Sequence, residues 1–199
     1  MRGGAAPPTC YDGSVSDSQS NPWQRKSRRL AYDNAWIELF HDEVVRPDGE
    51  PGVYGVVHFR NRAIGVLPLD ANADRILLVG QFRYTMDRYS WEIPEGGGPF
   101  DEDPEAAARR ELAEETGYRG GTWRELCRFD LSNSVTDEVG VLFVAAGLVA
   151  GDPSPEGTER IETRWVAFDE AMAMIGSEIT DAMTIIALQA VALERAGRR

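Results

Sequence analysis

The chain has 199 residues and a formal net charge of −12, with 42% hydrophobic and 27% charged residues. This length suits one domain with a small extension, and the composition is that of a globular protein with a proper core. The negative charge argues against nucleic-acid polymers and anionic membranes as partners, whereas bound cations can still make the local potential favourable for a small phosphorylated substrate.

Cysteine and histidine usage indicates a reducing compartment and no zinc site. Cys10 and Cys127 lie far apart and have the character of ordinary thiols. His41 and His58 have no cysteine or histidine close in sequence, which makes zinc binding improbable. The sequence contains no transmembrane run, and residues 1–24 lack the apolar stretch of a signal peptide. We therefore expect a cytoplasmic protein.

The N-terminal part is expected to comprise an arm and a β extension. Residues 1–26 are rich in Gly, Pro, Ser, Asn and Asp and predict a disordered or loosely attached arm. Residues 27–62 predict a β extension, with strands at 35–40 and 55–59 around a Pro-Asp-Gly turn at 47–49. Residues 63–199 then form the main domain.

The main domain alternates strands with helices. Aliphatic segments predict strands at 64–69 and 76–79, joined by a turn at 70–74, and extended segments at 81–84 and 91–94 lead toward a helix. After that helix we expect strands at 123–130, 139–145 and 163–168, a polar loop at 151–159, and helices at 169–175 and 181–196. This order favours an α/β fold with a mixed sheet between helices.

The helix predicted after residue 103 has clear start and stop signals. Asp103 suits an N-cap, and Pro104 suits the first helical position, where its missing N–H costs nothing. Ala106 to Ala108 and Leu112 favour helix, and Gly117 suits the left-handed residue that ends one.

Three glutamates share one face of this helix. Glu111, Glu114 and Glu115 are spaced i, i+3, i+4, so their like charges repel unless something positive lies there. Carboxylate oxygens bind hard divalent cations, and the spacing therefore predicts a metal site. The alternative is a solvated acidic helix face, which would have to explain several fixed spacings at once.

The segment from Gly96 to Tyr118, GGGPFDEDPEAAARRELAEETGY, closely resembles the signature box of the Nudix hydrolases. Gly96 is followed after five residues by Glu102, and after seven more by the run Arg110-Glu111-Leu112-Ala113-Glu114-Glu115-Thr116-Gly117. The last place departs from the family, which has a bulky aliphatic residue where this chain has Tyr118. The resemblance implies the Nudix α/β/α sandwich.

The resemblance also implies roles for the box residues. Glu111 and Glu115, with Glu114 next, would hold Mg²⁺, or Mn²⁺ as a substitute, together with the backbone carbonyl of Glu95, whose side chain adds a further negative charge. Arg110 would hold the glutamates in place through bidentate hydrogen bonds. The small side chain of Ala107, one turn before Glu111, would leave room for substrate. The alternative is that alanine stands there only for its helix propensity.

The general base is expected on a loop that can close over substrate. The segment 151–162 offers Glu156, Glu159 and Glu162. By resemblance to ADP-ribose pyrophosphatases, Glu159 matches the loop glutamate that precedes the next strand. The alternative is that all three are solvated loop acids.

Flanking motifs resemble the ADP-ribose pyrophosphatase and nucleoside-diphosphate-sugar hydrolase branch. They are Gln81-Phe82-Arg83-Tyr84 and Trp91-Glu92-Ile93-Pro94-Glu95-Gly96, in which Arg83 would contact a phosphate and Glu92 a sugar hydroxyl. In this branch the N-terminal sheet exchanges across a homodimer and supplies an aromatic residue to stack on the base, here Trp36. The alternatives are that Arg83 is a surface arginine, that Glu92 is a carboxylate at a strand end, and that Trp36 is a packed strand tryptophan.

The expected activity is hydrolysis of a nucleoside diphosphate sugar to a nucleoside monophosphate and a sugar phosphate, with ADP-ribose as the leading substrate. Residues 131–138 lack a proline that this branch typically carries, which leaves strict ADP-ribose preference open. The alternatives are GDP-mannose or a dinucleoside polyphosphate as substrate, or a non-catalytic domain that senses nucleotide sugars.

Overall fold

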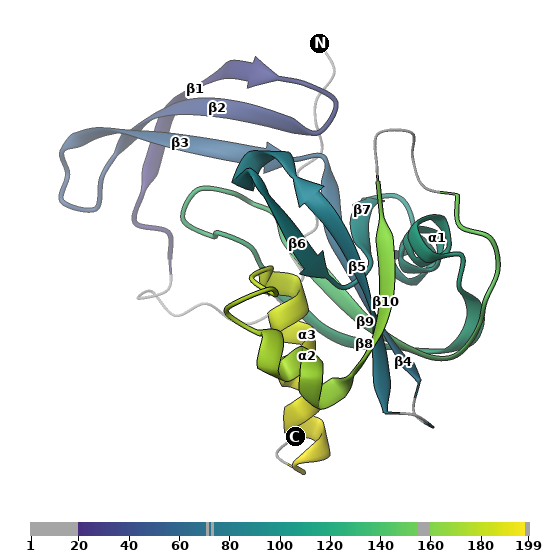
Figure 1. Ribbon diagram of the computed structural model, residues 1–199. Coiled ribbons are helices and arrows are strands. Elements are labelled where there is room, and N and C mark those ends of the chain that lie inside the picture. Colours follow the sequence, from purple (N-terminus) through teal and green to yellow (C-terminus); the bar gives the residue numbers. More distant parts are fainter. Residues whose placement is uncertain (1–19, 71, 73, 155–159, 198–199) are drawn as a thin grey trace.

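The computed structural model describes residues 20–70, 72, 74–154 and 160–197. Its strands form a three-stranded and a seven-stranded sheet, and helices cover both faces of the larger one (Figure 1). The expected α/β/α sandwich with a mixed sheet and a small N-terminal β-sheet is therefore confirmed. None of the described helices is long and apolar enough to cross a membrane.

The small sheet is antiparallel and has strand order β1-β2-β3, with β1 at Gln24–Asp33, β2 at Ile37–Val45 and β3 at Pro51–Phe59. On these strands only Asp42 and Val44 are buried. Strand β1 was not expected, and it begins within the segment predicted as an arm. Its sequence, QRKSRRLAYD, is exposed throughout and shows no apolar alternation from which a strand could be predicted. Residues 1–19 of that arm lie outside the described residues.

The large sheet has strand order β10-β5-β4-β9-β8. Its strands are β4 (Asn61–Asp70), β5 (Arg75–Arg83), β8 (Arg119–Asp130), β9 (Val139–Val149) and β10 (Glu162–Ala167). Two short strands extend it, β6 (Arg88–Glu92) on β5 and β7 (Glu95–Pro99) on β4, and a 3₁₀ turn at Tyr84–Met86 joins β5 to β6. Strands β4 and β9 are parallel and the other pairs are antiparallel, which makes the sheet mixed.

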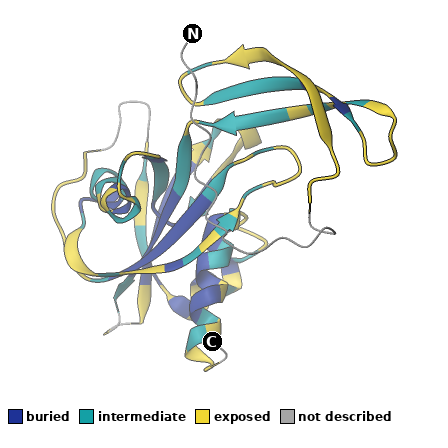
Figure 2. Cartoon of the chain, turned by 180° about the vertical axis from the view of Figure 1, so that it is seen from behind, coloured by how far each residue is buried: buried dark blue, intermediate teal, exposed yellow. Residues whose placement is uncertain are grey.

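Alternation along the central strand β9 divides the core into two layers. Val141 and Phe143 pack toward α1 (Pro104–Thr116), whereas Leu142 and Val144 pack toward α2 (Phe168–Met174) and α3 (Ala182–Arg195). The buried residues accordingly concentrate in the central strands and on the inner faces of the helices, whereas in the three-stranded sheet β1 is exposed and β2 and β3 are mostly half-buried (Figure 2).

The elements expected in the main domain are present with shifted ends, and one was missed. Strand β7 consists of Glu95-Gly96-Gly97-Gly98-Pro99, a composition that is unfavourable for strands in isolation. It forms because its backbone pairs with β4 while α1 packs over it. A single residue, Arg60, lies between β3 and β4 and thus joins the two sheets.

Candidate active site

Helix α1 carries the box glutamates and is capped as the sequence predicts. The Asp103 carboxylate accepts the Ala106 N–H at 3.0 Å, Pro104 occupies the first turn, and Gly117 ends the helix with φ of 77°. Ala107, Ala108 and Leu112 are fully buried against the sheet. Glu111 and Glu115 follow Ala107 at four-residue steps on one stripe of α1, and this stripe faces β7.

Arg110 is the hub of the carboxylate cluster on α1. Its Nη1 donates to Glu111 Oε1 at 2.7 Å and to Glu114 Oε2 at 3.2 Å. Its Nη2 donates to Glu102 Oε2 at 3.2 Å and to the Gly97 carbonyl at 2.9 Å. These carboxylates raise the pKa of Arg110 against the opposing effect of burial. One guanidinium thus holds three box glutamates against strand β7.

The glycines of β7 let the carboxylates approach the sheet. A Cβ atom on Gly96 would overlap the Glu111 carboxylate, and one on Gly98 would crowd Ile64 and Ala107. Glu115 is only 4% exposed, and its Oε2 accepts the Glu95 N–H at 3.1 Å. The backbone at 95–96 therefore lies directly beside both Glu111 and Glu115.

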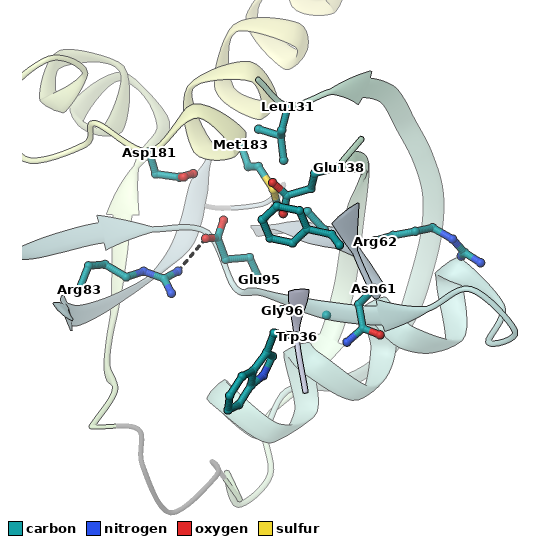
Figure 3. Close-up of a pocket in the computed structure, with 13 residues that line it drawn as sticks. Trp36, Asn61, Arg62, Arg83, Glu95, Gly96, Leu131, Glu138, Asp181 and Met183 are labelled. Atoms are coloured by element: carbon teal, nitrogen blue, oxygen red, sulfur yellow. Dashed lines mark hydrogen bonds and ion pairs between the residues drawn. The ribbon is translucent and has the colours of Figure 1, made fainter. Parts of the chain in front are cut away.

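A second cluster forms around Arg83, at the end of β5. Its Nε lies 3.1 and 3.0 Å from the two Glu92 oxygens, and its Nη2 donates to Glu92 Oε2 and, at 2.7 Å, to Glu95 Oε1 (Figure 3). Glu92 is 3% exposed. Burial, with Asp181 and Glu92 nearby, raises the pKa of Glu95 well above its usual range, although Arg83 opposes the shift.

Two adjoining cavities of about 350 and 530 Å³ form a cleft between the small sheet, β7 and the start of α3. Five residues line both cavities: Phe59, Arg83, Glu95, Glu138 and Asp181. The first cavity, shown in Figure 3, also includes Trp36, Asn61, Gly96 and Gly97. The second includes Glu92. The cleft thus meets the α1 cluster at the glycines of β7.

The structure brings most of the expected site residues to this region. Trp36 is 69% exposed and lines the first cavity, so it is not the packed tryptophan of the alternative reading. Arg83 and Glu92 line the second cavity and are paired with each other. If Arg83 contacts a phosphate as expected, it must do so while it also holds the carboxylates of Glu92 and Glu95.

The expected general base cannot be placed. Glu156 and Glu159 lie outside the described residues. Glu162, at the start of β10, is exposed and accepts a hydrogen bond from the Tyr89 hydroxyl at 3.2 Å. Neither cavity is lined by it.

Several cleft residues were given no role from the sequence, among them Phe59, Asn61, Glu138 and Asp181. Glu138 ends the 131–138 segment, and burial together with Asp137 raises its pKa. Asp181 caps α3 by accepting the Thr184 N–H at 2.7 Å. Its position before the helix indicates an N-cap, and no local pattern in the sequence indicates a place in the cleft.

The oxygen donors beside β7 fit a hard cation, although no ready-made centre is present. Among the residues that the structure describes, no three Asp, Glu, His or Cys side chains are grouped as a metal centre. However, Glu95 Oε2 is buried without a hydrogen-bond partner, and a carboxylate oxygen in that state is costly unless a cation or proton compensates it. Glu111, Glu115 and the Glu95 carbonyl supply only oxygen, the donor that Mg²⁺ prefers.

Comparison with known families agrees with this geometry. A family described as NUDIX domain matches residues 59–184. The chain belongs to the Nudix family. A second family, the nucleoside diphosphate sugar hydrolase N-terminal domain, matches residues 23–57. The boundary between the two matches falls at the end of β3, next to the Arg60 junction.

Relatives of this Nudix hydrolase extend over most of its length. It is 32% identical over 163 residues to an ADP-ribose pyrophosphatase of Bacillus subtilis, covering 80% of this chain and 87% of that protein. It is 33% identical over 158 residues to the CMP-5'-(N-acetyl-N-hydroxy-3-aminopropyl)phosphonate hydrolase of Streptomyces rubellomurinus, covering 78% and 74%. A solved structure titled as an ADP compounds hydrolase superposes with a TM-score of 0.79 at 17% identity, covering 94% and 100% of the two chains, and supports the fold.

Proposed function

We propose that this Nudix hydrolase cleaves the pyrophosphate bond of ADP-ribose or a related nucleoside diphosphate sugar in a Mg²⁺-dependent reaction. The products would be a nucleoside monophosphate and a sugar phosphate. The observation that carries the proposal is the cleft that joins the Arg110 carboxylate cluster to the exposed Trp36 ring. The N-terminal domain match and the ADP-ribose pyrophosphatase relative support the substrate class.

Glu111, Glu115 and the carbonyl of Glu95 would hold the cation, with Glu114 beside them. Bound Mg²⁺, or Mn²⁺ in its place, supplies charge neutralisation for the phosphoryl oxygens and lowers the pKa of a water. Arg110 keeps the carboxylates of Glu111 and Glu114 oriented, since both are hydrogen-bonded to its Nη1. It also ties the helix to the carbonyl of Gly97.

Substrate recognition is assigned to the cleft walls. The Trp36 ring is free to stack on a nucleobase, because more than two thirds of the residue is exposed. The Glu92 carboxylate would accept from a sugar hydroxyl on the side away from Arg83. A phosphate would approach Nη1 of Arg83, since Nε and Nη2 already hold Glu92 and Glu95. Glu159 remains the proposed general base.

We also propose a homodimer that covers the apolar surface of the small sheet and of the neighbouring β5–β6 hairpin. Large apolar side chains are exposed on both: Leu30, Tyr32, Val53, Phe82, Tyr84, Met86 and Tyr89. A monomer rarely leaves so many apolar residues exposed together. Sedimentation equilibrium tests the dimer, and Tyr84→Asp should shift the mass toward the monomer.

The deciding experiment is hydrolysis of a panel comprising ADP-ribose, ADP-glucose, GDP-mannose, UDP-glucose and diadenosine polyphosphates. Each is incubated with Mg²⁺, with EDTA as the control, and monophosphate products are detected through a coupled phosphatase. We expect metal-dependent cleavage of one nucleotide sugar far above the others. If GDP-mannose or a dinucleoside polyphosphate is cleaved best, that compound would replace ADP-ribose as the proposed substrate. Binding without any turnover would support a sensor domain instead.

A further inference from the structure

The segment between β8 and β9 is attached to the edge of the small sheet. The Val57 N–H donates to the Val135 carbonyl at 2.9 Å, and the Asp137 N–H donates to the Val57 carbonyl at 3.2 Å. The Tyr54 hydroxyl donates to the Ser134 carbonyl at 2.7 Å. Val57 and Thr136 form a parallel β-bridge. Residues 131–138 therefore continue the small sheet beyond β3.

The Asp137 side chain makes two further contacts between this segment and β3. Its Oδ1 accepts the Phe59 N–H at 3.1 Å, and its Oδ2 lies 2.5 Å from His58 Nδ1. Phe59 lines both cavities of the cleft, and so does Glu138, the residue that follows Asp137. Neither cavity is lined by Asp137 itself. One carboxylate thus holds together two segments that line the cleft, at Phe59 and at Glu138, and does not itself line either cavity.

Trp36 and Phe59 form the aromatic wall of the cleft, and their backbones are linked. Ile37 of β2 pairs with Phe59 of β3, and Trp36 immediately precedes Ile37. The Arg60 N–H also donates to the Trp36 carbonyl at 2.9 Å. A change in the position of Phe59 is therefore passed to Trp36 through hydrogen-bonded backbone.

We propose that Asp137 is a positioning residue for substrate recognition, which sets the spacing between the Trp36–Phe59 wall and the Glu138 wall. This inference rests on the proposed function, in which those walls bind the substrate. Without the Asp137 contacts the cleft would have to be ordered by the substrate, and affinity would fall by the cost of that ordering. The Arg110 cluster makes no contact with Asp137, so the chemical step should be unaffected.

The test compares Asp137→Ala with Asp137→Asn, in which the amide oxygen can still accept from Phe59 and the amide nitrogen faces His58. Asp130→Ala, at an exposed carboxylate at the end of β8, is the matched control. We expect Asp137→Ala, which removes both contacts of the carboxylate, to raise KM by at least about tenfold, with kcat within about twofold. Asp137→Asn and Asp130→Ala should stay within about twofold of the unsubstituted enzyme in both constants. An unchanged KM in Asp137→Ala, or a fall in kcat alone, overturns the inference.

Two further measurements keep the inference open to refutation if Asp137→Ala does not fold. His58→Ala removes only the Oδ2 contact and should raise KM by a smaller factor, so an unchanged KM counts against the inference. Amide hydrogen exchange at Phe59 should be faster in His58→Ala, because the carboxylate that accepts this N–H is then held less firmly. Absence of turnover by the unsubstituted enzyme would overturn the proposed function alone, and the same comparisons would then be made on Kd by calorimetry.

Discussion

The two sheets of this protein differ in what holds them together. The seven-stranded sheet is buried on both faces, under α1 on one side and under α2 and α3 on the other. The three-stranded sheet buries only Asp42 and Val44, and it depends on backbone pairing and on the 131–138 segment. We infer that the large sheet supplies the chemistry and most of the stability, whereas the small sheet supplies recognition.

The sharpest test of this division is Glu111→Gln on the large-sheet side. The side chain keeps its size and loses its charge, so we expect turnover to fall by at least about a hundredfold. The melting temperature should change little, because the amide oxygen of glutamine can still accept the hydrogen bond from Arg110, which also holds Glu102 and Glu114. The control is Glu105→Gln on the same helix, which breaks only an exposed pair with Arg109. Near-normal kcat in Glu111→Gln would remove this residue from the site.

Glu92→Gln should separate stability from chemistry within the large sheet. The substitution breaks a buried, bidentate pair with Arg83, whose own side chain is 37% exposed. We expect a loss of about 2 kcal/mol in the free energy of unfolding, less than for a fully buried pair. Urea denaturation measures it, and Glu105→Gln, with an expected loss below about 0.5 kcal/mol, again serves as control. Equal losses in the two variants would show that the Arg83 cluster is not structural.

On the small sheet, Trp36→Ala should affect recognition and leave the chemical step intact. Loss of a stacking ring should raise KM by about tenfold while kcat stays within about twofold. Trp23→Ala removes a tryptophan that directly precedes β1, packs edge-to-face on Tyr54 and does not line the cleft. Steady-state kinetics on both variants would show the contrast, and equal KM values would take Trp36 out of the site.

The smallest effect is expected from Asp42 at acid pH. Bidentate hydrogen bonds from Arg28 hold the pKa of Asp42 below its usual value of 3.8. The stabilisation is therefore present above about pH 3.8 and is lost as pH falls through the lower folded-state pKa. As pH falls, the free energy of unfolding of the unsubstituted protein should drop by at most about 1 kcal/mol more than that of Asp42→Asn, because Arg28 is partly exposed. Urea titrations between pH 3 and 6 measure this difference. An advantage of the unsubstituted protein over Asp42→Asn that shrinks as pH rises would contradict the assignment.

Local signals made the α1 site predictable. Asp103, Pro104 and Gly117 set the ends of the helix through contacts within a few residues, and the spacing of the glutamates then fixes a shared face. These features do not depend on distant parts of the chain. The fold class and the box could therefore be predicted before the structure was known.

Other features depend on contacts that the sequence does not reveal. Strand β1 is exposed along its whole length and has no apolar alternation, and it forms through its pairing with β2. Glu138 and Asp181 reach one cleft from segments more than forty residues apart, and no local pattern links them. Likewise, the pairing of Arg83 with Glu92 and Glu95 is a tertiary contact, so its guanidinium was assigned to a phosphate alone.

The one-residue junction at Arg60 limits how the two sheets can move. Adjacent Cα atoms are about 3.8 Å apart, so a single residue between β3 and β4 provides almost no slack for one sheet to slide away from the other. Rotation about the dihedral angles near Arg60 is the freedom that remains. A ligand between Trp36 and β7 would therefore be enclosed by a change in the angle between the two sheets rather than in their separation.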